Sequence, residues 1–137
     1  MKLYIDEAGT PLVVARVEEA EAVLTARIAY AEARAAFARH RREGALAPEA
    51  LRRIIRELDA EWAAMTLVDL TEPLIHRAGA LAEHHALRGY GAVHLAAALE
   101  VAQSGADLEF AAFDRPLNQA ARRERLRLTL ASGPGRR

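Results

Sequence analysis

The stretch "LRGYGAVHLAAALEVAQSG", residues 87–105, predicts a helix that soon becomes almost pure Ala, Leu and Val. Tyr90 and His94 stand near its beginning. Gly89 and Gly91 occupy positions where a helix normally begins with Asp, Ser or Thr. The neighbours of this helix decide the fold class. The glycine at position 91 raises a second question, which is whether a chemical group has been removed there.

Short apolar segments and helix-forming segments alternate along the chain. Strands are predicted at residues 2–5, 23–29, 66–70, 108–113 and 127–130. Helices are predicted at residues 11–22, 30–44, 47–65, 72–87, 87–105 and 115–126, with Thr71 capping the fourth and Gly89 ending it. Strands that alternate with helices indicate an α/β fold with a parallel sheet covered on both faces.

Composition limits the class of protein. The chain has 137 residues, which predicts one domain, expected at residues 1–130, followed by a flexible tail at 131–137. Lys plus Arg and Asp plus Glu are 19 each, so bulk charge gives no argument for nucleic-acid binding. Cysteine is absent, which excludes disulfides and thiolate metal sites. With no apolar run of about 18 residues and no leader pattern, we expect a cytoplasmic protein.

Two acidic residues lie at strand-to-helix junctions, where open parallel α/β sheets bind ligands. Asp114 directly follows the predicted strand 108–113 and could cap the next helix, which is worth about 1 kcal/mol, while still facing a cleft. Glu32 lies one turn into the helix that follows strand 23–29. Its helical neighbours are small and apolar, so we expect it to be buried or beside a cleft. A carboxylate there needs either a metal ion or an arginine partner.

The histidines argue against a zinc site. His84 and His85 are adjacent, and adjacent residues on a helix point about 100° apart, so they cannot chelate one ion together. No HExxH spacing occurs. His94 is expected to be a structural histidine that makes hydrogen bonds near the sheet.

Three segments resemble successive parts of a PIN domain of the VapC type, the toxin half of bacterial and archaeal toxin–antitoxin pairs. They are "RIAYAEARAAFARHRREG", "LRGYGAVHLAAALE" and "FAAFDRPLNQAA". The most specific piece is "GYGAVHLAAAL", which in the family usually reads Gly-Tyr-Asp-Ala-Val-His-Leu-Ala. The resemblance runs through residues 7–128 and implies a PIN-like three-layer α/β/α fold with a central parallel sheet.

The resemblance implies a Mg²⁺- or Mn²⁺-dependent endoribonuclease in which several carboxylates gather at the strand ends. Glu32 and Asp114 correspond to two of these catalytic, metal-binding acids. Gly91 stands at the position of the family's central Asp, so one ligand has been lost. Because affinity for divalent ions depends on the charge of the ligands, we expect weak metal binding and impaired nuclease activity.

The fourth acid of the family has two possible alignments. Asp6 is that acid if residues 2–5 form the family's first strand, although part of the following helix is then missing. Aligned without gaps, the same residues match the end of the family's first helix, and the first strand is absent. That strand lies centrally, so its loss would expose two sheet edges. Either residues 2–5 fill the gap or the native protein is longer.

The resemblance also implies partners, namely a second copy in a homodimer, a cognate antitoxin whose segment covers the acidic cleft, and an RNA substrate. Arginines cluster at residues 39–42, 52–56 and 122–127. Such clusters usually mark solvated helix ends, but they can also contact phosphates, with Arg39, Arg41 and Arg42 as candidate RNA contacts. The alternatives to an active toxin are a non-catalytic module that binds an antitoxin or a regulatory complex, and a decayed relic.

Overall fold

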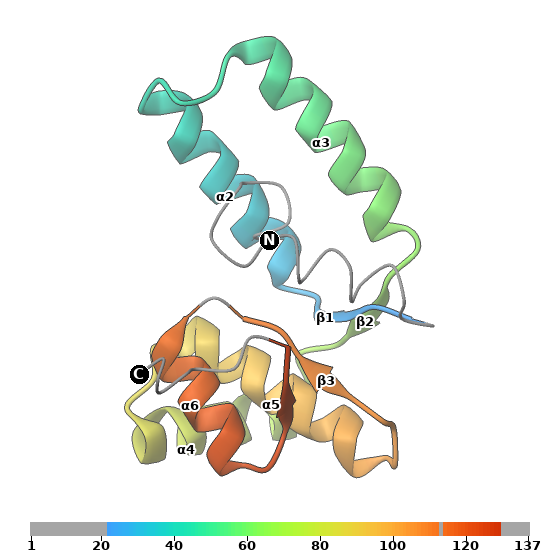
Figure 1. Ribbon diagram of the computed structural model, residues 1–137, viewed down its shortest axis with the longest axis vertical. Coiled ribbons are helices and arrows are strands. Elements are labelled where there is room, and N and C mark those ends of the chain that lie inside the picture. Colours follow the sequence, from blue (N-terminus) through green and yellow to red (C-terminus); the bar gives the residue numbers. More distant parts are fainter. Residues whose placement is uncertain (1–21, 113, 130–137) are drawn as a thin grey trace.

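The computed structural model describes residues 22–112 and 114–129, which form a mixed α/β fold (Figure 1). In chain order the elements are β1 (Leu24–Ala26), α2 (Ala29–Arg42), α3 (Pro48–Trp62), β2 (Thr66–Val68), α4 (Glu72–His85), α5 (Gly89–Gln103), β3 (Glu109–Phe110), α6 (Arg115–Arg123) and β4 (Arg127–Leu128). The predicted order of strands and helices is confirmed here. The predicted strand 2–5, helix 11–22 and tail 131–137 lie outside the described residues.

The strands are parallel but form two separate pairs. In the first pair Leu24 lies opposite Thr66 in register, and β1 and β2 run parallel. In the second pair Glu109 lies opposite Arg127, again in parallel. Within the described residues the strands form two separate pairs and not one sheet, while the predicted parallel direction is confirmed; the predicted strand 2–5 lies outside this part of the chain.

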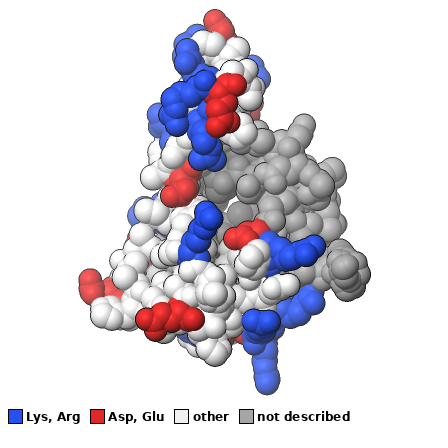
Figure 2. Space-filling view, turned by 90° about the vertical axis from the view of Figure 1, so that its left-hand side faces the viewer, with Lys and Arg blue, Asp and Glu red and all other residues white. Residues whose placement is uncertain are grey.

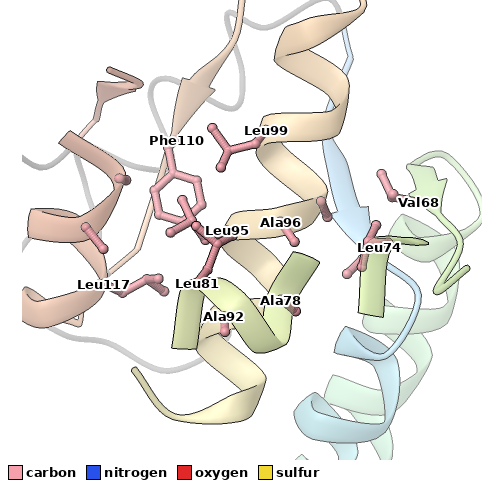
Figure 3. Close-up of a cluster of buried hydrophobic side chains, with 14 residues drawn as sticks. Val68, Leu74, Ala78, Leu81, Ala92, Leu95, Ala96, Leu99, Phe110 and Leu117 are labelled. Atoms are coloured by element: carbon pink, nitrogen blue, oxygen red, sulfur yellow. The ribbon is translucent and has the colours of Figure 1, made fainter. Parts of the chain in front are cut away.

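Side-chain packing joins the two strand pairs where backbone hydrogen bonds do not. Each described strand has only two or three residues, so its hydrogen-bonded ladder ends early. A single apolar cluster nevertheless includes Val68 from the first pair and Phe110 from the second. Figure 3 shows Leu95 and other side chains of α5 between them. The alternating pattern of the sequence predicts parallel strands, but it does not specify which strands pair.

Helix α5 is the most deeply buried helix of the described residues. Its fully or nearly buried side chains are Ala92, Leu95, Ala96, Ala97 and Leu99. Alanine has a small side chain, so the backbone of α4 can approach closely. The contact between α4 and α5 is more extensive than that between any other two described elements. None of the helices in residues 22–112 and 114–129 combines the length and apolar character needed to cross a membrane.

The predicted start of helix α4 is confirmed, but the helix ends earlier than predicted. At the start, the Thr71 hydroxyl accepts a hydrogen bond from the Leu74 amide at 3.3 Å, so the predicted cap is confirmed. At the end, α4 stops at His85 and not at Gly89. Ala86 takes the left-handed conformation with φ of 56°, and the Leu87 amide bonds back to the Ala82 carbonyl at 3.0 Å.

Helices α2 and α3 form a hairpin that rises above the rest of the described fold (Figure 1). Its own core contains Ala33, Phe37 and Leu58, all with no exposed surface. Tyr30 joins the two helices near the base, because its hydroxyl donates to the Asp59 carboxylate at 2.6 Å. The hairpin therefore has a core separate from that around α5.

We predict that Leu95→Ala lowers the free energy of unfolding by about 2–5 kcal/mol, because it leaves a cavity between α5 and the strands. Ile75→Ala on α4 is the control, since Ile75 is 40% exposed and its loss should cost less than about 1 kcal/mol. Urea unfolding followed by circular dichroism measures both. Equal losses would contradict the central position of Leu95.

Candidate functional site

The candidate site lies at the starts of helices α2, α5 and α6. Glu32 is in the first turn of α2, Gly91 in the first turn of α5, and Asp114 directly before α6. Helix α5 contacts β1, the strand directly before α2, and the charge of Glu32 contributes to the raised pKa of Tyr90. Gly91 in turn lies next to Leu117 of α6. We use the name helix-start site for Glu32, Tyr90, Gly91 and Asp114.

The Glu32 side chain was expected to be buried or beside a cleft; it is exposed, which leaves the second alternative. Ala29 and Ala33 form the buried stripe of this part of α2. Position 32 is about 100° around the helix from position 33, which carries its side chain away from that stripe. Within residues 22–112 and 114–129, no arginine forms an ion pair with Glu32. In this part of the chain, no ion pair occupies its carboxylate oxygens.

Asp114 occupies the cap position of α6 without acting as a cap. Its backbone is extended, with φ of −91° and ψ of 117°, but its side chain makes no hydrogen bond to the helix. The predicted location is confirmed, and the predicted capping bond is wrong. The side chain is exposed, and no described residue forms an ion pair with it. Helix α6 thus leaves the Asp114 carboxylate available for other contacts.

Asn118 fixes the loop that carries Asp114, and it was not identified from the sequence. It is 5% exposed, and its side-chain amide donates to the Ala112 carbonyl at 2.9 Å. Its backbone amide donates to the Asp114 carbonyl at 3.0 Å. These two bonds hold both flanks of the junction between β3 and α6. The only sequence signal was a polar residue on the apolar side of the helix "RPLNQAA".

Gly91 is not required by the local backbone or by a lack of space. It lies within α5, and a Cβ built there would meet only Leu117, with 3.7 Å to each of Cδ1 and Cδ2. That separation is an ordinary van der Waals contact. The described residues therefore leave space for a Cβ atom at this position.

Tyr90 and His94 pack against each other beside Glu32. Their ring centroids are 4.3 Å apart, and the rings are 85° from parallel. Burial, followed by the charge of Glu32, raises the pKa of Tyr90 to about 12, so its phenol is neutral at physiological pH. The spacing of four residues in "YGAVH" was the signal for this contact.

His94 was expected to make hydrogen bonds near the sheet, and in the described part of the chain no such bond is found at its Nε2 atom. Its Nε2 atom is buried and has no hydrogen-bond partner among the described residues. Burial lowers the pKa of His94 to about 4, because the charged imidazolium would lose its hydration. His94 is therefore a neutral, apolar support for the Tyr90 ring.

His85 belongs to a different contact, at the far ends of α4 and α6. Its Nε2 atom lies 2.8 Å from Oε2 of Glu124, and the His85 side chain is 3% exposed. This pair links the last residue of α4 to the residue that follows α6. Glu124 follows the last residue of α6, whereas Asp114 precedes the first, so this pair is separate from the helix-start site. Its role is structural.

The described residues contain no group of three or more His, Asp or Glu side chains arranged to share a metal ion. The carboxylates of Glu32 and Asp114 are hard oxygen donors of the type that Mg²⁺ and Mn²⁺ prefer. Asp6, the contested third ligand, lies outside the described residues. The donor chemistry of the helix-start site fits a divalent ion, while its two described carboxylates are a small set for holding one.

Two curated proteins are similar to the chain. Ribonuclease VapC45 of Mycobacterium tuberculosis (strain CDC 1551 / Oshkosh) is 41% identical over 121 residues, which cover 88% of this chain and 83% of the relative. Ribonuclease VapC49 of Mycobacterium tuberculosis (strain ATCC 25618 / H37Rv) matches with the same identity and coverage. A comparison with models of protein families finds no match.

We predict that the buried imidazole of His94 makes the fold less stable in acid. The folded-state pKa is about 4 and the unfolded value is 6.5, so the unfolded chain binds more protons between these values. The free energy of unfolding should fall by roughly 1–3 kcal/mol as the pH drops across this range. Urea unfolding of the wild type and His94→Gln measures the difference. A pH dependence that is the same in both would contradict the assignment.

Proposed function

The chain belongs to the VapC ribonuclease family, and on that premise we propose that it is a PIN-fold toxin that cleaves RNA with a weakly held divalent metal ion. The observation that carries the proposal is the pair of exposed carboxylates, Glu32 and Asp114, which form no ion pair with the described residues. They stand at the two positions where the family resemblance expects catalytic acids. The proposal includes the three-layer α/β/α arrangement of a PIN domain.

Glu32 and Asp114 would hold Mg²⁺ or Mn²⁺ through their carboxylate oxygens. When bound, such an ion supplies positive charge beside the scissile phosphate and activates water. The chain itself provides the setting for these acids. Asn118 fixes the loop before α6, and the contact between Tyr90 and His94 fixes the first turn of α5.

The weak binding follows from the number of negative charges. Gly91 contributes no oxygen where the family has Asp. The Tyr90 phenol has a pKa of about 12, so it adds no charge near neutral pH. His94 is neutral as well, because its pKa is about 4. Affinity for a hard cation rises with ligand charge, so two carboxylates bind it less firmly than three or four.

The missing ligand also favours a second candidate function, in which the chain is a non-catalytic module that binds a cognate antitoxin. In either case we propose a homodimer and an antitoxin segment that covers the helix-start site. The exposed Tyr90 ring, with 36% of its surface accessible, offers such a segment an apolar contact next to Glu32. Cleavage assays separate the two functions.

We predict that the purified chain cleaves RNA only when Mg²⁺ or Mn²⁺ is present. Glu32→Gln and Asp114→Asn should each lower the rate by roughly 100-fold, equivalent to about 2.7 kcal/mol of transition-state stabilisation, because each removes a charged ligand. Glu57→Gln is the matched control, since Glu57 is an exposed acid on α3. Gel assays with a chelator measure all four proteins.

Absence of cleavage by the wild type would favour the non-catalytic module. Cleavage that persists without divalent ions, or that Glu32→Gln leaves unchanged, would contradict the assigned site. Loss of activity in the Glu57→Gln control would show that the effect of acid removal is not specific to the helix-start site.

We further predict that Gly91→Asp tightens Mn²⁺ binding by roughly tenfold, because it adds a charged oxygen ligand. The fold should tolerate the change, since the new Cβ meets only Leu117 at 3.7 Å. Gly91→Asn is the control, because it has nearly the same size and no charge. Isothermal titration with Mn²⁺ compares the three proteins. Equal affinities of the Asp and Asn variants would show that position 91 does not face the metal site.

A further inference from the structure

The outer part of the α2–α3 hairpin is strongly basic. Residues 34–56 carry seven arginines and two glutamates, a formal charge of 7 − 2 = +5, whereas the whole chain has a net charge of zero. All seven arginines are exposed. Figure 2 shows blue side chains over much of the upper part of the molecule, where the hairpin lies. The positive charge is thus concentrated at the outer end of the hairpin, whereas the whole hairpin, residues 29–62, carries seven arginines and six acids.

Two helical stripes of arginine lie on the same side of this hairpin. On α2, Tyr30 and Arg34 are four residues apart, and Arg41 is two turns beyond Arg34. On α3, the stripe consists of Arg52, Arg56 and Asp59 at intervals of four and three. The Tyr30 hydroxyl donates to Asp59 at 2.6 Å, which places the two stripes side by side. We name this side, with Arg34, Arg41, Arg52 and Arg56, the arginine face.

Little negative charge neutralises the arginine face. Asp59 lies at its base and accepts the Tyr30 hydrogen bond, while Arg34 donates to the Tyr30 hydroxyl at 2.9 Å. Arg52 lies 3.8 Å from Glu49, but the two side chains are 63% and 79% exposed, so solvent screens the pair. Within the described residues, no carboxylate forms an ion pair with Arg41 or Arg56.

Helix stability explains only part of this arrangement. The basic residues in the last turn of α2 complement the negative end of its dipole. Arg52 and Arg56, by contrast, lie in the first two-thirds of α3, which begins at Pro48 and has no basic residue in its last turn. The dipole of α3 gives no reason for cations there, so these arginines require another account.

We propose that the arginine face binds the phosphate backbone of RNA, away from the helix-start site. This inference rests on the proposed function, because it takes RNA as the substrate. Guanidinium groups bind phosphate oxygens through paired hydrogen bonds. The Cβ atoms of Arg52 and Arg56 are about 6 Å apart on the helix, so the two side chains reach neighbouring phosphates of one strand. Of the arginines expected to contact RNA, Arg41 lies on this face, while Arg39 is on the other side of α2.

The test compares two double variants with equal loss of charge. Arg41→Gln with Arg52→Gln removes one arginine of the face from each helix. Arg39→Gln with Arg123→Gln removes one arginine from the other side of α2 and one exposed arginine from the end of α6, and serves as the control. Binding to a fluorescent oligouridylate is measured by anisotropy without divalent ions across a range of salt concentrations. Phosphate contacts are independent of sequence, so this probe suffices.

The face variant should bind the oligouridylate roughly tenfold more weakly than the wild type. The slope of log affinity against log salt should also decrease by about 1.4, which corresponds to two contacts of about 0.7 each on a single strand. The control should keep the wild-type slope. Equal losses in both variants would reduce the effect to general charge attraction and overturn the proposal, as would a wild type that does not bind the RNA.

The results separate this proposal from the proposed function. If the wild type binds the oligouridylate through the arginine face but cleaves no RNA, the nuclease assignment fails and the face stands. If the chain cleaves RNA and the face variant binds as tightly as the wild type, the face fails alone. Tighter, face-dependent binding of a labelled polyglutamate would assign the surface to an acidic protein and overturn the RNA assignment.

Discussion

The close packing of α5 against its neighbours is the contact on which the position of the helix-start site depends. Ala92 and Ala96 have no exposed surface, so neighbouring backbone can approach the helix closely. Leu95 fills the space between α4, β3 and α6 (Figure 3). Because α5 is fixed along its length, its first turn is fixed as well. That turn carries Tyr90 toward Glu32 of α2 and Gly91 toward Leu117 of α6.

Charge is distributed unevenly between the two parts of the described fold. The outer hairpin carries a formal +5, whereas the first turn of α5 contributes no charge to the helix-start site. Under the proposed function, the outer part of the hairpin would attract an RNA strand at long range, while the carboxylates of Glu32 and Asp114 would repel its phosphates. A bound divalent cation would remove that repulsion at the site. On this proposal, attraction by the hairpin and capture by a metal are separate contributions, and the first persists when the second is weak.

Local patterns in the sequence predicted the local structure, and tertiary contacts decided the rest. The Thr71 cap and the helix predicted at residues 47–65 depend on residues within a few positions of each other, and both are confirmed. The burial of Glu32, the cap at Asp114 and the single sheet depend on what packs against each element. In the described residues Glu32 is exposed, the Asp114 side chain makes no capping bond and the strands form two separate pairs. Positions 32 and 114 were identified from their place at strand-to-helix junctions, and the family resemblance gave them, with position 91, their expected roles.

Gly91 has no explanation in the stability of the fold. Glycine in a helix costs about 1 kcal/mol relative to alanine, and an acid in the first turn would add a favourable interaction of roughly 0.3–1 kcal/mol with the helix dipole. Helix α5 has no acidic residue in its first turn, so it lacks the interaction with the dipole, and it has no side-chain cap either. The neighbouring Leu117 leaves room for a side chain. Neither the backbone of α5 nor the described packing around position 91 requires glycine there. Its physical consequence is a lower negative charge at the helix-start site, which under the proposed function weakens metal binding.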